Sequence, residues 1–278
     1  MTGFWGWVDD SNMRESTRPV HVVRVSGARR ERTSDLVATE APLELRIGGR
    51  PFAVIMRTPG ADEELAAGFL FAEHIVQSAT NISAIAVVSQ DPDAAVLDIV
   101  LAECDLDTVF GKERRVLSNA SCGVCGRPEL ESLVVNSAPV DNGWRVPAST
   151  LTGLPSAAQR EQAVFSETGG LHAAALFDAA GRVTMLREDI GRHNAVDKVI
   201  GRRLLDAALP AANCGLFVSG RASFEIVQKA WAAGIPLIAA VSAPSSLAID
   251  LAEQAGITLA GFVRADRFNV YSHPERLT

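Results

Sequence analysis

Two cysteines separated by two residues, Cys122 and Cys125, are the side chains of this chain best suited to chemistry. A glycine follows each of them, so the pair is predicted to lie on a flexible segment rather than inside a packed element. A thiol reacts as its thiolate, which neighbouring cations stabilise. Basic residues flank the pair on both sides: Lys112, Arg114, Arg115 and Arg127. The other two cysteines, Cys104 and Cys214, stand alone, so the pair is the expected sulfur centre.

A C-x-x-C pair is compatible with several functions. Structural zinc usually takes a second such pair or two closely spaced histidines, and the five histidines here are scattered. A thioredoxin-type redox motif opens a helix after a strand, whereas Ser, Asn, Ala and Gly surround this pair. A stable disulfide is typical of exported proteins. We favour a mobile nucleophilic cysteine that accepts sulfur as a persulfide and hands it on. Zinc binding, redox chemistry and a pair without a role stay open as alternatives.

Composition excludes some broad classes. The chain has 278 residues, 47% of them hydrophobic, enough for one large core or two modest ones. A net charge of −7 and a pI of about 5.3 argue against binding nucleic acid by neutralising its phosphates. No basic segment leads into an apolar one at the N-terminus, and no apolar run reaches membrane-spanning length. We therefore expect a cytoplasmic protein with reduced cysteines that binds neither nucleic acid nor membranes.

The pattern along the chain predicts an α/β protein whose N-terminal part is a smaller α+β domain. Four segments are expected: a mobile arm over 1–19, the α+β domain over 20–103, a mobile loop with the cysteine pair over 104–127, and an α/β cofactor-binding domain over 128–278. The loop assignment rests on its length, charges and glycines, since long loops are usually functional or disordered.

Alternating apolar residues predict the elements of the first domain. Strands over 43–47 and 52–56 flank Gly48-Gly49, which suits a hairpin turn. The acidic run 62–64 opens a helix, because carboxylates favour the positive end of a helix dipole. Two further strands are expected near 83–89 and 95–101.

The last domain shows strands and helices in turn. Pro147 and Pro155 each open a predicted short helix within 146–165, because proline suits the first helical position. A hairpin of strands 173–177 and 183–186 follows, and then a helix after Gly191. Strands over 215–218, 236–241 and 258–263 alternate with helices over 223–233 and 245–255. This alternation predicts right-handed crossovers and a sheet covered on both faces, in three layers.

A ligand is expected at the carboxyl ends of these strands, where helix N-termini point their N–H groups. Three turns there combine glycines, hydroxyls and arginines: Asp189–His193, Ser219–Ser223 and Ser242–Ser246. Arg192 and Arg221 are suited to pairing with phosphate oxygens. For each single turn, simple helix capping is an equally valid interpretation. Two further segments are expected at the same edge of the sheet: the glycine-rich segment 165–172 and the segment 262–267 with its two arginines.

Together these motifs resemble those of one family, the formate dehydrogenase accessory sulfurtransferases, also called the FdhD/NarQ family. The resemblance rests on Cys122–Gly126, Thr168–Ala173, Arg187–Lys198, Ser219–Ser223 and Phe262–Tyr271, and it spans roughly residues 40–278. It implies a sulfur carrier that takes sulfur from a cysteine desulfurase as a persulfide. The sulfur then passes to the molybdenum or tungsten of a bis(molybdopterin guanine dinucleotide) cofactor, bound as the substrate to be sulfurated and destined for apo formate dehydrogenase.

The resemblance also assigns roles to residues of this chain. Cys122 is expected to carry the persulfide and Cys125 to assist it. The segment Phe262, Val263, Arg264, Ala265, Asp266 and Arg267 is expected to contribute to the cofactor site. Further candidate cofactor-binding residues come from the turns: Gly169, Gly170, His172, Arg192, His193, Ser219, Gly220 and Arg221. Asp189 and Asp197 could orient the ligand or move protons, with packing in the core as the equal alternative.

A homodimer and a C-terminal domain resembling the cytidine-deaminase fold are also implied. The chain lacks an H-x-E motif followed by P-C-x-x-C, so deaminase chemistry is not expected. Two other functions remain as alternatives to sulfur transfer. One is a non-catalytic cofactor chaperone in which the cysteines are dispensable, and the other is a zinc-binding interaction module.

Overall fold

The computed structural model describes residues 15–91, 94–102, 109–110, 138–140 and 143–278. Cys104, Cys122 and Cys125 lie outside these residues, as do most of the predicted loop 104–127 and the first fourteen residues of the predicted arm. Within the described part, the strands form a two-stranded ribbon, a four-stranded sheet and a six-stranded sheet. The predicted α/β class is therefore confirmed.

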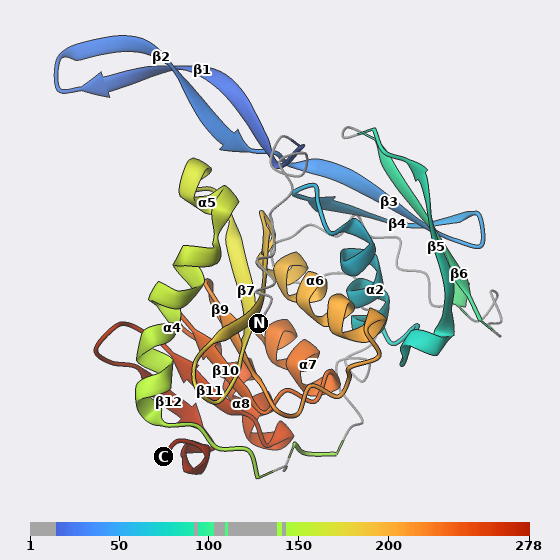
Figure 1. The fold of residues 1–278 in the computed structure, drawn as a ribbon, viewed down its shortest axis with the longest axis vertical. Helices are drawn as coiled ribbons and strands as arrows, with labels where there is room; N and C mark the ends of the chain where they lie inside the picture. The colour runs from blue at the N-terminus through green and yellow to red at the C-terminus, as the bar shows by residue number, and fades with distance from the viewer. Residues whose placement is uncertain (1–14, 92–93, 103–108, 111–137, 141–142) are drawn as a thin grey trace, which may run out of the picture.

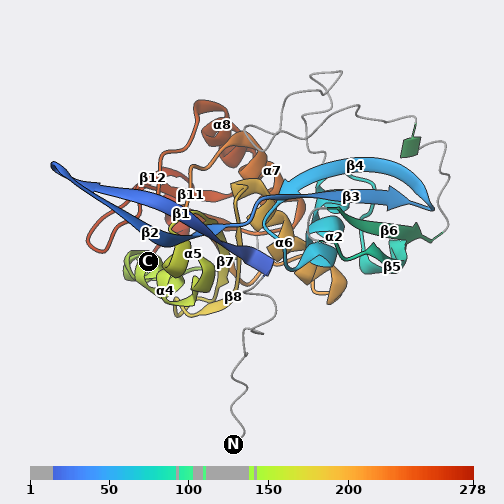
Figure 2. The same cartoon turned by 90° about the horizontal axis from the view of Figure 1, so that it is seen from above.

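The ribbon was not predicted. Its strands, β1 (Thr17–Ser26) and β2 (Arg29–Ala38), are antiparallel. Their far end extends beyond the rest of the molecule (Figures 1 and 2), while β2 packs near helix α5 (Ala163–Thr168). β1 begins within the segment that we expected to be an arm. The ribbon escaped prediction because arginine and histidine interrupt the valines of β1 and because β2 is mostly polar, so neither strand shows the clean alternation of a half-buried strand.

The four-stranded sheet confirms the strands predicted for the first domain. Its order is β4-β3-β6-β5, where β3 is Ala41–Ile47, β4 is Arg50–Arg57, β5 is Ile82–Ser89 and β6 is Ala95–Leu101. Gly48 and Gly49 both have positive φ angles, 57° and 80°, which explains why glycines form this turn. Helix α2 (Asp62–Ala72) begins at the predicted acidic run.

Helix α2 packs closely on helix α6 (Arg192–Leu205) through two glycines. A Cβ atom on Gly68 would overlap the carbonyl of Asp197, and one on Gly201 would overlap the carbonyl of Glu64. The two backbones therefore touch where the helices cross (Figure 1). Buried side chains of both helices belong to one hydrophobic cluster, so the four-stranded sheet shares its core with the C-terminal half.

The six-stranded sheet has the order β12-β11-β10-β9-β7-β8. Its strands are β7 (His172–Phe177), β8 (Val183–Asp189), β9 (Gly215–Val218), β10 (Leu237–Ala240), β11 (Thr258–Gly261) and β12 (Asn269–Ser272). The strands β9, β10 and β11 are parallel, as the alternation predicted, and the remaining pairings are antiparallel. β12 was not predicted.

Helices cover both faces of this sheet, as expected. α6, α7 (Phe224–Ala232) and α8 (Ser246–Ala255) lie on one face, and α4 (Ala148–Glu161) lies on the other (Figure 1). The two faces of the sheet therefore border two separate hydrophobic clusters. Consecutive residues of β7 point to opposite faces, so Leu176 belongs to the first cluster and Phe177 to the second. Two short 3-10 turns, Ala79–Asn81 and Pro274–Arg276, complete the described elements.

The prediction that Pro155 opens a second helix was wrong. Pro155 lies inside α4, and the second helix, α5 (Ala163–Thr168), begins later. The apolar residues Leu151, Leu154 and Ala158 run through the proline at helical spacing and are buried against the sheet. Their packing maintains one continuous helix, although proline removes a backbone hydrogen bond there.

Candidate functional site

The turns predicted to meet at one sheet edge lie side by side in the structure. Three backbone hydrogen bonds join them: Ser242 N–H donates to Gly220 O (3.2 Å), Ser245 N–H to Ala222 O (3.1 Å) and Phe262 N–H to Ser242 O (3.2 Å). These bonds link the segments that follow β9, β10 and β11. The order of the parallel strands therefore brings Ser219–Ser223, Ser242–Ser246 and the segment from Phe262 to one place.

His172 enters the same edge from the start of β7. Its Nδ1 lies 3.4 Å from Ser219 Oγ, which also accepts the Ala173 N–H at 2.8 Å. Ser219 Oγ therefore holds both the imidazole and the backbone at the start of β7. Gly220 gives these side chains room, since a Cβ at that position would meet the imidazole at 3.3 Å and Arg192 Cδ at 3.4 Å.

The edge carries positive charge around His172. Burial lowers the pKa of His172, the guanidinium groups of Arg192 and Arg221 lower it further, and Asp189 opposes them. The imidazole is therefore neutral at neutral pH, while the two arginines remain charged. A neutral N–H donor between guanidinium groups suits an anion such as a phosphate ester.

The segment 262–267 forms a tight turn in which Arg264 N–H donates to Arg267 O at 2.8 Å. Phe262 adopts a φ of 53°, an uncommon conformation for a bulky residue, and 42% of its surface is exposed. Val263 is fully buried, so it anchors the turn in the core and offers no surface to a ligand. Arg264 Nη1 donates to the carbonyls of Val241 (2.6 Å) and Val263, and exposed Arg267 lies 3.3 Å from Asp266. Of the two arginines expected to bind an anionic ligand, Arg264 thus already donates to backbone carbonyls of the protein, and Arg267 lies near an acidic neighbour.

A scan against protein families matches residues 38–278 to the FdhD/NarQ family. The chain belongs to the FdhD/NarQ family. It is 48% identical over 263 residues to the Sulfur carrier protein FdhD of Nocardia farcinica, covering 92% of this chain and 93% of that one. It is 46% identical over 249 residues to the protein of the same name from Thermoplasma acidophilum, covering 88% and 87%.

A solved structure shares the fold of this FdhD/NarQ chain. It is a putative formate dehydrogenase accessory protein from Desulfotalea psychrophila, with a TM-score of 0.77 and 27% identity. The similarity covers 95% of this chain and all of that one. The resemblance inferred from the motifs is therefore confirmed.

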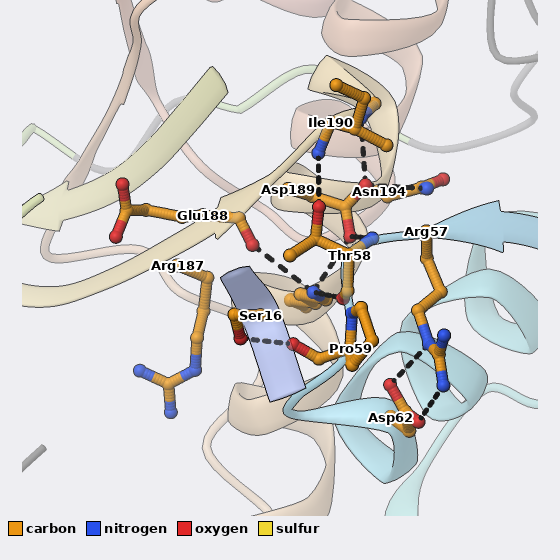
Figure 3. Close-up of polar contacts among 12 residues, drawn as sticks. Ser16, Arg57, Thr58, Pro59, Asp62, Arg187, Glu188, Asp189, Ile190 and Asn194 are labelled. Atoms are coloured by element: carbon orange, nitrogen blue, oxygen red, sulfur yellow. Dashed lines mark hydrogen bonds and ion pairs between the residues drawn. The ribbon is translucent and has the colours of Figure 1, made fainter. Parts of the chain in front are cut away.

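In this FdhD/NarQ chain, residues of the segment Arg187–Lys198 form the hydrogen bonds and the ion pair that hold the turn before α6 in place (Figure 3). Asp189 Oδ1 accepts the Gly191 N–H at 2.8 Å and Asn194 Nδ2 at 2.9 Å. Asp189 Oδ2 lies 2.8 Å from Lys198 Nζ and accepts the Thr58 N–H at 3.2 Å. The turn between β8 and α6 is thereby tied to the link between β4 and α2. Of the two roles left open for Asp189, the structure supports packing.

A second buried network lies behind the edge. His193 Nε2 lies 3.1 Å from Ser223 Oγ and 3.6 Å from a carboxylate oxygen of Glu225. Glu225 is 3.2 Å from Lys229 Nζ, which in turn lies 2.6 Å from Asp197. Burial raises the pKa of Asp197 to about 7, with Lys229 opposing the shift. Asp197 therefore holds α6 to α7, and His193 contacts the edge at Ser223.

Gly169 and Gly170 connect α5 to His172. Gly169 ends the helix with a φ of 66°, a conformation that favours glycine. Glu188 holds the other end of α5, since its carboxylate accepts the N–H groups of Val164 (3.0 Å) and Phe165 (2.8 Å). Sequence reasoning missed Glu188, Thr58 and Lys229, whose partners lie far away in the chain.

Metal-binding clusters and membrane-spanning helices are both absent from the described residues. Within the described ranges, no three His, Cys, Asp or Glu side chains gather as a metal site would require. None of the helices there is long and apolar enough to cross a membrane.

Cys214 is the one cysteine among the residues that the structure describes. It is half-buried, its Sγ donates to Ala211 O at 3.3 Å, and burial raises the pKa of its thiol to about 11. It is therefore a poor nucleophile, unlike the thiol expected at Cys122.

Proposed function

We propose that this protein is a sulfur carrier that serves the maturation of formate dehydrogenase. The observation that carries the proposal is the match of residues 38–278 to the FdhD/NarQ family, together with relatives that are named sulfur carrier proteins. The solved neighbour is described as a putative formate dehydrogenase accessory protein. The activity is that of a sulfurtransferase in the cytoplasm. The proposal includes a homodimer and a C-terminal domain of the cytidine-deaminase type.

In the first step, the Cys122 thiolate attacks the terminal sulfur of a persulfide on a cysteine desulfurase. A sulfur–sulfur bond forms at Cys122 while the one on the donor breaks, and the donor cysteine leaves as its thiolate. No external oxidant is needed, because the transferred sulfur keeps its oxidation level. Cys125 assists by receiving or displacing the persulfide. A thiol lying among glycines and basic residues is suited to this exchange.

In the second step, the substrate is a molybdenum or tungsten bis(molybdopterin guanine dinucleotide) cofactor. The bond between Cys122 and the terminal sulfur breaks, the carrier recovers its thiol, and the metal supplies two electrons as it takes the sulfur as sulfide. The sulfurated cofactor then goes to apo formate dehydrogenase.

The sheet edge supports this choice of substrate. Arg192 and Arg221 offer positive charge to diphosphates, and the imidazole of His172 adds a polar group between them. Exposed Phe262 offers a ring on which a guanine base can stack. The ion pair of Asp189 with Lys198, and the hydrogen bond from Gly191 N–H to Asp189, fix the turn that carries Arg192. The edge is thus preorganised for a large anionic ligand.

The decisive experiment maps sulfur on the protein after incubation with a cysteine desulfurase and cysteine. Peptide masses are expected to show one added sulfur on Cys122, lost in a Cys122→Ala variant and kept in a Cys214→Ala control. A label absent from Cys122 while the desulfurase is active would overturn the carrier role. Full formate dehydrogenase maturation by a Cys122→Ala, Cys125→Ala double variant would instead identify a cofactor chaperone. Stoichiometric zinc that is lost with either cysteine would identify a zinc-binding module.

A further inference from the structure

The ribbon formed by residues 17–38 projects from the body of the molecule in Figure 1, and in Figure 2, seen from above, its tip extends past the C-terminal half. Its strands pair along their whole length, from Thr17 opposite Ala38 to Ser26 opposite Arg29. Val23 and Val25 are 56% and 58% exposed. A two-stranded hairpin alone is at best marginally stable in water, and its unpaired edges invite association. We therefore expect the exposed part of the ribbon to pack against the surface of another protein molecule.

One face of the ribbon combines exposed valines with polar and basic residues. Alternation places Pro19, Val23 and Val25 of β1 on the same face as Leu36 of β2, which lies opposite Pro19, and the pair His21 and Ser34 lies between them. Two arginines share this face, Arg30 opposite Val25 and Arg32 opposite Val23. We refer to Pro19, Val23, Val25, Leu36, Arg30 and Arg32 as the valine face.

The charge of the ribbon is opposite to that of the rest of the chain. Residues 17–38 contain five arginines and two acidic residues, a net charge of +3. The whole chain carries −7, so the remainder carries −10. Opposite potentials attract and orient two protein surfaces. The body of a second copy is therefore a complementary partner for the ribbon.

The ribbon is held firmly at its base. Thr39 N–H donates to Ser16 O and Ser16 Oγ donates to Pro59 O, both at 2.9 Å. A Cβ on Gly170, in the segment that leads to His172, would come into van der Waals contact with Ala38. An arm with a fixed direction loses little conformational freedom when it docks. The base also places the arm beside the candidate edge.

We propose that the ribbon is the dimerisation arm of this protein, and that each of two copies lays its valine face on the acidic body of the other. This inference rests on the homodimer of the proposed function and adds the surface that forms it. A ten-residue strand spans about 33 Å, so one face of the ribbon offers roughly 300 Å². Reciprocal exchange buries two such faces and the two surfaces that receive them. The total is on the order of 1,200 Å², at the lower limit of the range of stable interfaces.

The test measures the mass of the full-length protein by light scattering and sedimentation over a range of concentrations. The wild-type protein is expected to dimerise, and a Val23→Asp, Val25→Asp variant is expected to dimerise about tenfold more weakly or worse. A Val87→Asp, Val88→Asp variant is the matched control, because these valines are 45% and 55% exposed on β5 of the other sheet. An Arg30→Glu, Arg32→Glu variant tests the charge separately and keeps the apolar residues. Circular dichroism checks that each variant is folded.

Two results would overturn the proposal that the ribbon is a dimerisation arm. One is a wild-type protein that stays monomeric at every concentration, and the other is an unchanged dimer in both ribbon variants. Sulfur loading of Cys122 in the same variants separates this inference from the carrier role. Normal loading of a monomeric ribbon variant supports the arm and leaves sulfur carriage intact. Loading that fails in the wild-type protein as well counts against the carrier role alone.

Discussion

Lys198 and Asp189 form an ion pair in the interior of the molecule, with 2.8 Å between Nζ and Oδ2. Both side chains are at most 2% exposed. The lysine also donates to the carbonyl of Thr58 at 2.9 Å, so the pair joins the turn before α6 to the link before α2 (Figure 3). The candidate edge therefore depends on a contact between residues that are far apart in the chain.

Replacing Lys198 with methionine is expected to lower the free energy of unfolding by about 3–5 kcal/mol, because it leaves a buried carboxylate without its partner. Arg182→Met is the control. It breaks a pair with Asp178 in which the arginine is 80% exposed, and it should cost less than about 1 kcal/mol. Urea denaturation measures both losses. Equal losses in the two variants would contradict the role assigned to Lys198.

Gly201→Ala should destabilise the protein by at least about 1–3 kcal/mol, since its Cβ would overlap the carbonyl of Glu64 on the neighbouring helix. Gly153 offers a matched helical control, with open space around its missing Cβ. Gly153→Ala should stabilise the protein by roughly 0.5–1 kcal/mol through helix propensity. Thermal unfolding of the two variants distinguishes these effects by their opposite sign.

The free energy of unfolding should depend on pH through Asp197. Its pKa is about 7 in the folded protein, against 3.8 for an unperturbed aspartate, so the folded state binds more protons between these values. Stability from this group is present below about pH 4 and is lost as pH rises towards 7, by up to about 1.4 kcal/mol per pH unit. Lys229, whose pKa is raised, stays charged throughout. Denaturation at several pH values should show that Asp197→Asn removes this slope, and an unchanged slope would refute the assignment.

His172 is expected to titrate below 6.5, the ordinary pKa of a histidine, because of burial and the charges of Arg192 and Arg221. Arg221→Ala should move the midpoint upwards, towards 6.5, by removing one of these charges. NMR titration of the histidine ring measures this shift. Arg182→Ala, which alters an exposed arginine on the β7–β8 hairpin, should leave the midpoint in place.

Cys214 should resist thiol reagents at neutral pH. With a pKa of about 11, only on the order of one in 10⁴ of its thiols is ionised at pH 7. Alkylation with limiting iodoacetamide, followed by peptide mapping, should label Cys122 or Cys125 well before Cys214. Denaturing the protein should abolish the difference. Rapid labelling of Cys214 in the folded protein would contradict its assigned burial.

Local patterns predicted the elements whose side chains alternate cleanly. The strands around Gly48-Gly49, the helix from Asp62 and the parallel strands of the larger sheet were found because burial of one face imposes a period on the residues. The ribbon was missed because it is mostly exposed and shows no such period, and β12 because its four residues are too few to show one. Pro155 misled the prediction because the packing of Leu151, Leu154 and Ala158 outweighs a local signal.

The sequence by itself determined the family, the sulfur chemistry to test and the turns that gather at one edge. It did so because glycines, hydroxyls and arginines recur where strands end, and strand order then brings those ends together. Only the tertiary structure decided what each charged residue of the string Arg187–Lys198 does. Asp189 meets Thr58, and Asp197 meets Lys229, across separations that no local period encodes. Asp189 and Asp197 are buried and bind other elements of the fold, whereas His172 and Arg221 lie at the edge, where a ligand can reach them.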